Sequence, residues 1–116
     1  MDVERSPEER FALDLGRSVD RLRSMGLARL AASFEPEPTR ADAARGAAQS
    51  IADLASDLAG DPRREVPRLA DGAVGDQLAV CGRDLLDAAA AHGEQPETRA
   101  ALADATAMVL ELRRRV

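Results

Sequence analysis

Hydrophobic and polar residues alternate along this chain with the period of an α-helix in four separate segments. Leucine, valine and alanine recur at three- and four-residue spacings, while aspartate and arginine occupy most positions between them. Stretches rich in proline and glycine separate the segments, and no strand-like alternation is visible. The pattern predicts an all-α fold with helices at about 7–25, 40–59, 73–92 and 96–115.

Capping residues support these boundaries. Ser6 precedes Pro7, and a glutamate follows three residues after the serine, which together favour a helix start. Thr39 is expected to cap the second helix and Asp71 the third. Gly93 is placed to end the third helix.

The connections between the helices predict how the helices assemble. Residues 27–33 are expected to add a short helix, and the Glu-Pro-Glu-Pro run at 35–38 breaks the chain. Residues 61–69 predict an extended surface connection, which Val66 and Leu69 would hold against the helices. Residues 1–116 are therefore expected to form a single domain, a four-helix up-and-down bundle.

The third predicted helix contains two interior glycines. Gly75 and Gly82 lie on nearly one line with Ala79 and beside Leu86, which predicts close packing of another helix against these four residues. Each glycine costs about 1 kcal/mol relative to alanine, so close packing must offset this cost. A phosphate loop is excluded, because no strand precedes the glycines and the chain has no lysine. A bend or a gap for a ligand stays open, as does whether a second chain contacts this seam.

The polar side of the same helix carries Gln77, Asp76, Asp84 and Asp87. The simplest interpretation is a solvated face. Gln77 and Asp84 could instead form a polar site against another helix, and two of the carboxylates could share a divalent ion or an acid–base role. No metal or cofactor is predicted, because the chain lacks the Glu-x-x-His motifs of metal sites in bundles.

Cys81 and His92 are the only cysteine and the only histidine. About 16 Å of helix separates them, so they are not expected to act as a pair. Cys81 is predicted to be a small core residue, and His92 to lie at the helix end. The arginines at 113–115 are expected to complement the dipole at the end of the last helix.

Composition narrows the class of protein. The formal net charge of −5 argues against binding to nucleic acid. No apolar run is long enough for a membrane span, and the charged N-terminus has no secretory signal pattern. A lone cysteine agrees with a reducing compartment, so a cytoplasmic protein is expected.

Two stretches carry a resemblance to known proteins. GAVGDQLAVCGRDLLDAA and RSVDRLRSM resemble segments of short, uncharacterised actinobacterial helical proteins, over about a third of the chain. GRDLL is also similar to a helix of the DinB and mycothiol-dependent isomerase bundles, in which three histidines hold a metal. That resemblance implies a four-helix bundle without the metal-dependent activity, because this chain has only His92 and carries Arg83 within GRDLL.

No catalytic arrangement of residues is visible in the sequence. The wide apolar arc of the third helix instead predicts a small bundle that acts through protein–protein contacts, as a homodimer or as an accessory subunit of an unknown partner. The alternative is a bundle enzyme that binds a small ligand or a metal through carboxylates of the third helix.

Overall fold

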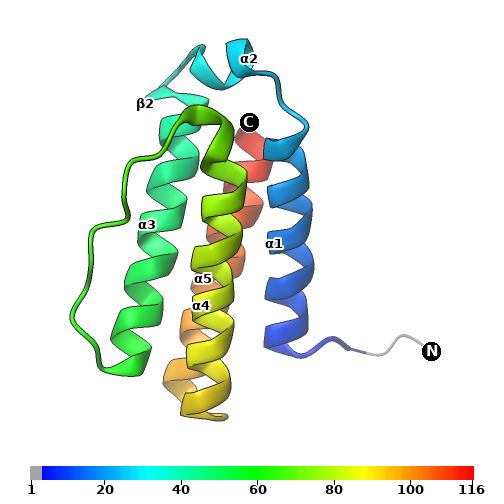
Figure 1. The fold of residues 1–116 in the computed structure, drawn as a ribbon. Coiled ribbons are helices and arrows are strands. Elements are labelled where there is room, and N and C mark those ends of the chain that lie inside the picture. Colours follow the sequence, from blue (N-terminus) through cyan, green and yellow to red (C-terminus); the bar gives the residue numbers. More distant parts are fainter. Residues whose placement is uncertain (1–3) are drawn as a thin grey trace.

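The computed structural model describes residues 4–116, and the first three residues of the charged N-terminus lie outside the described residues. Residues 4–116 contain five α-helices, one 3-10 turn and a two-stranded hairpin (Figure 1). The all-α class and the short helix after the first helix are confirmed. The elements are α1 (Pro7–Arg23), α2 (Leu27–Ala31), β1 (Ser33–Phe34), β2 (Glu37–Thr39), α3 (Arg40–Ala59), η1 (Asp71–Ala73), α4 (Val74–His92) and α5 (Pro96–Arg115).

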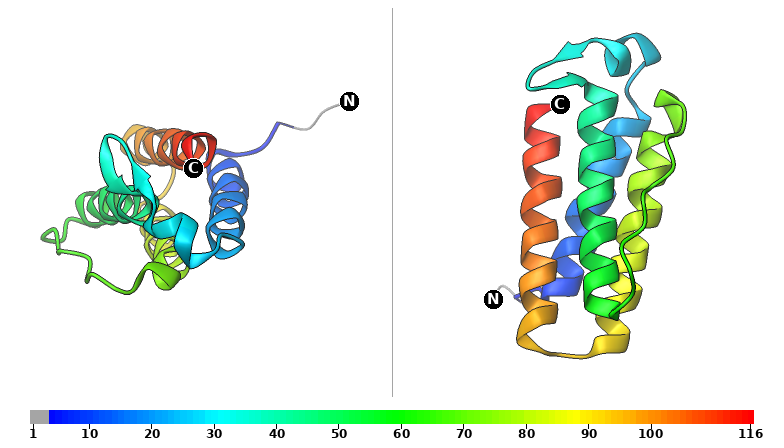
Figure 2. Two further views of the ribbon diagram at one scale, coloured as in Figure 1. Left: turned by 90° about the horizontal axis from the view of Figure 1, so that it is seen from above. Right: turned by 90° about the vertical axis from the view of Figure 1, so that its left-hand side faces the viewer.

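The four long helices differ from the expected up-and-down order at one connection. α1 and α5 run toward the end of the bundle that carries α2 and the hairpin, whereas α3 and α4 both run away from it (Figure 1; Figure 2, right). Residues 61–70, here called the strap, connect the end of α3 to η1 and return along the outside of the bundle (Figure 1). An extended segment of this length spans up to about 33 Å, which is enough to pass a helix of about 30 Å. The hydrophobic pattern of the sequence does not show that the chain returns along the bundle before α4 begins.

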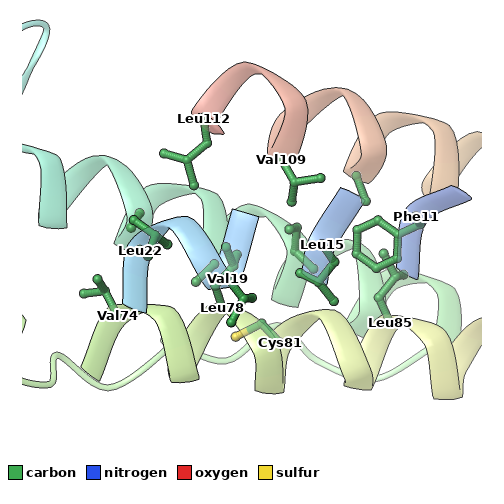
Figure 3. Packing of buried hydrophobic residues seen from close by; sticks show 14 of the residues in the cluster. Phe11, Leu15, Val19, Leu22, Val74, Leu78, Cys81, Leu85, Val109 and Leu112 are labelled. Carbon is green, nitrogen blue, oxygen red and sulfur yellow. The ribbon is translucent and has the colours of Figure 1, made fainter. Parts of the chain in front are cut away.

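The long helices pack around one core. Viewed along the bundle, α1 and α3 occupy opposite corners, and each packs against both α4 and α5 (Figure 2, left). Phe11 and Leu15 of α1 point inward with Leu78 and Leu85 of α4 and Val109 of α5 (Figure 3). All are buried, as their helical spacing predicts. No helix within residues 4–116 is both long and apolar enough to cross a membrane.

Two of the three predicted N-caps form and one does not. The hydroxyls of Ser6 and Thr39 accept hydrogen bonds from backbone N–H groups three residues later, each at 3.1 Å. Asp71 does not cap α4; its carboxylate instead accepts a hydrogen bond of 2.7 Å from Arg45. The chain passes through the 3-10 turn η1 before α4 begins, which moves the helix start beyond the reach of Asp71. α1 also ends earlier than expected, at Arg23.

The hairpin was not expected from the sequence. β1 and β2 pair antiparallel, with Ser33 opposite Thr39 and Phe34 opposite Glu37. Strands of two and three residues are too short to show an alternating period, so the pattern had no means of revealing them. The hairpin lies across one end of the bundle with α2 (Figure 1).

Arginines attach this hairpin to the last helix. The guanidinium carbons of Arg40 and Arg115 lie 4.8 and 5.1 Å from the centroid of the Phe34 ring. Arg115 also pairs with Glu37 at 2.6 Å, and its hydrogen bond lowers the pKa of that carboxyl group. Arg113 pairs with Asp14 and Arg114 with Glu111. The three arginines at the end of α5 therefore each contact an acid of the same chain.

Candidate functional site

The glycine seam of α4 faces α1 of the same chain. A Cβ atom placed on Gly82 would lie 2.8 Å from Cδ1 of Leu15 and closer still to its Cδ2. A Cβ atom on Gly75 would lie 3.1 Å from Cγ of Arg23. Ala79 and Leu86, the other two seam residues, are half-buried against the core. Because α1 packs against both glycines, a second chain would have to contact another part of the surface.

A hollow surface lies on another side of α4. A groove of about 1020 Å³ runs between α3, α4 and the strap. Two of its lining residues are exposed large hydrophobics: Val80 is 61% exposed and Leu69 is 47% exposed. The apolar lining includes Ala52, Ala55, Ala59, Val66, Leu69 and Val80. Several apolar side chains that are exposed to solvent within one hollow are typical of a binding surface.

Long polar side chains from the helices hold the strap in place. Gln49 of α3 accepts a hydrogen bond from the backbone N–H of Val66 at 2.8 Å and donates one to the carbonyl of Arg64 at 3.0 Å. Gln77 of α4 donates to the carbonyl of Pro67. The strap therefore forms a fixed wall of the groove, because both neighbouring helices bind its backbone.

One end of the strap meets a network of charges. Arg45 donates to the carbonyl of Leu69 and pairs with Asp42 at 2.9 Å and with Asp71 at 2.7 Å. Burial alone would raise the pKa of Asp42, but hydrogen bonds from Thr39 and Arg45 lower it overall. The charged form of Asp42 is thus favoured where the strap joins α4.

Two sequence expectations change at the strap. Gln77 was assigned to a solvated face, but it is only 7% exposed because the strap covers it. Val66 is half-buried against the core as expected, whereas Leu69 is 47% exposed. The backbone of Leu69 is held by Arg45, so its side chain is free to face the groove.

Gln77 and Asp84 both line the groove, and within the described residues no hydrogen bond joins their side chains. Gln77 binds the strap backbone, and Asp84 is exposed. Within residues 4–116, no group of three or more histidine, cysteine, aspartate or glutamate side chains is placed to hold a metal ion. The two residues therefore contribute separately to the groove, Gln77 by holding one wall and Asp84 by carrying charge.

The carboxylates around the groove are only partly neutralised. Asp76 pairs with Arg23 at 2.7 Å, and Asp87 pairs with Arg83 at 3.1 Å. Within the described part of the chain, the three other carboxylates and the one guanidinium in the lining have no ion-pair partner. These four are Asp61, Glu65, Asp84 and Arg64. The unpaired charges around the groove thus leave an excess of negative charge.

Cys81 lies in the groove lining but is buried. Burial raises the pKa of its thiol, and the nearby charge of Asp84 raises it further. A thiol with a raised pKa is a poor nucleophile at neutral pH. Cys81 thus acts as an apolar part of the groove.

His92 lies in the last turn of α4, away from the groove lining. Its Nε2 atom is 3.9 Å from a carboxylate oxygen of Glu97 on α5. Gly93 ends the helix with a φ of 82° and donates its N–H to the carbonyl of Ala89. This arrangement places the only histidine of the chain at a helix end.

One signal in the sequence could have located this groove. Val80 is an apolar residue on a helical face that otherwise carries Asp76, Asp84 and Asp87, at spacings of three or four residues.

No protein-family model, curated protein or solved structure matches this chain. The groove itself is therefore the feature from which a function can be inferred.

Proposed function

We propose that this protein is a cytoplasmic accessory subunit that acts through contact with another protein, and that the groove is its contact surface. The observation that carries the proposal is the exposure of Val80 and Leu69 together in one hollow. Exposed apolar residues grouped within a polar rim favour a surface that a partner covers.

The shape of the groove supports a polypeptide as the occupant. Its lining extends from Ala73, the last residue of η1, along one side of α4 to Ala88, a distance of about 22 Å. A helix of about four turns has this length. A compact small molecule would cover only part of such a groove, and the rest of the apolar lining would stay in contact with water.

A small-ligand or metal site built on carboxylates of α4 has less support. Asp76 and Asp87 are each already engaged by an arginine, which leaves Asp84 as the only unpaired carboxylate that α4 contributes to the groove within the described residues. A single exposed carboxylate holds a cation weakly, because hard cations take several oxygen ligands.

Photo-crosslinking tests the proposed contact surface. We expect a photoreactive amino acid at Val80 to give a discrete crosslinked species in cells of the source organism. Leu110 is the matched control, because it is also an exposed large hydrophobic but lies on α5, at the corner of the bundle diagonal to α4. The crosslink should be absent when the photoreactive residue replaces Leu110. Equal crosslinking at both positions, or none at Val80, would contradict the proposal.

A further inference from the structure

We propose that the groove takes a basic, amphipathic helix of the partner protein, an inference that rests on the proposed function and specifies the chemistry of the partner. The apolar lining requires one apolar face on that helix. The unpaired charges around the groove favour basic residues on both sides of that face.

The part of the groove lining that the helices supply includes several alanines. Ala52, Ala55 and Ala59 of α3 and Ala88 of α4 contribute methyl groups, so the volume above them is unfilled. The occupant must therefore supply large apolar side chains. Binding gains free energy when such side chains pack closely against the alanines and remove their apolar surface from water. Leucines at three- and four-residue spacings on one helix face meet this requirement.

The charges lie on both sides of the groove. Asp84 is on α4, and Asp61 and Glu65 are on the strap opposite. Within the described residues these three carboxylates have no ion-pair partner, and Arg64 is the one unpaired cation beside them in the lining. A helix with arginine or lysine on both flanks of its apolar face would place opposite charges along each rim.

A second copy of this chain fits the groove poorly. In a two-fold symmetric dimer each subunit presents the same patch, so the acidic rims of two copies would face one another. The chain's own basic run, Arg113–Arg115, is already paired with Asp14, Glu111 and Glu37. The charge distribution therefore favours a different protein over self-association.

Three designed peptides test this inference on the full chain. Each has about 16 residues and the same leucine face, and the flanking positions are all arginine, all glutamine or all glutamate. Fluorescence anisotropy is expected to show the tightest binding for the arginine peptide and the weakest for the glutamate peptide. Raising the salt concentration to about 500 mM should weaken binding of the arginine peptide about tenfold.

Charge-neutralising variants connect the binding to these carboxylates. Asp84→Asn combined with Glu65→Gln should weaken binding of the arginine peptide about five- to tenfold. The control is Asp20→Asn combined with Asp104→Asn, which changes the net charge equally at exposed sites outside the groove lining. This control should change the affinity less than about twofold.

The possible failures can be told apart. If the glutamine peptide binds as tightly as the arginine peptide, the basic character of the partner is wrong while the groove still acts as a contact surface. If none of the three peptides binds, docking of a helix is overturned. If light scattering shows a dimer that Val80→Asp dissociates, the groove is filled by a second copy and the inference is overturned. The crosslink at Val80 tests the proposed function independently of all three peptides.

Discussion

Gly82→Leu is expected to lower the free energy of unfolding by about 3 kcal/mol. Leu15 of α1 occupies the space where the new side chain would begin, since even a Cβ atom would lie 2.8 Å from its Cδ1. A Leu15 rotamer change could make room for one methyl group, but a complete leucine side chain requires α1 and α4 to separate. Urea unfolding followed by circular dichroism measures the change.

Gly16→Leu is the matched control for this prediction. Gly16 is also an interior glycine of a helix, but a Cβ atom placed on it would meet nothing within 4 Å. The substitution should therefore stabilise the protein by about 0.5–1 kcal/mol through helix propensity alone. If Gly82→Leu stabilised the protein to the same extent, the close approach of α1 to α4 would be refuted.

Gln49→Ala is expected to raise the rate of tryptic cleavage in the strap about ten- to thirtyfold. Gln49 makes two hydrogen bonds to the strap backbone, at Val66 and Arg64. Each contributes about 1 kcal/mol, and cleavage follows the population of the opened strap when opening is fast. Arg63, Arg64 and Arg68 provide the cleavage sites, and mass spectrometry of the fragments gives the rate at each.

Gln95→Ala provides the control for the strap prediction. Gln95 is exposed, and its side chain makes no capping hydrogen bond at the start of α5. Its replacement should leave the cleavage pattern of the strap unchanged. A strap that was cut equally fast in the Gln49→Ala variant and the unsubstituted protein would show that Gln49 does not hold this wall of the groove.

The sequence was sufficient to predict the helices. Local signals determine where a helix begins and ends, and these signals were present at Ser6, Thr39 and Gly93. Apolar spacing then identified the inward face of each long helix, including Leu78 and Leu85 of α4. These features depend on residues within a few positions of one another, so they can be read from one segment at a time.

The groove depends on contacts that cannot be read in this way. The path of the strap is fixed by Gln49, Gln77 and Arg45, which lie 10 to 24 residues from the strap residues whose backbone they bind. Nothing in the local pattern shows that Gln77 has a backbone carbonyl as its partner. The direction of α4 likewise follows from the strap. A short turn after α3 would make α4 antiparallel to α3, whereas the returning strap makes the two helices parallel, and helix periodicity is the same in both cases.

Amide chemical shifts of the labelled protein, titrated with the arginine peptide, test most directly whether the groove is a docking surface. We expect the largest changes at Val66, Leu69, Val80 and Asp84, which line the groove. Residues on the face of α5 that carries Leu110 should change little. Changes centred on Leu110 or on the exposed Leu27, with none at Val80, would contradict the proposed docking surface.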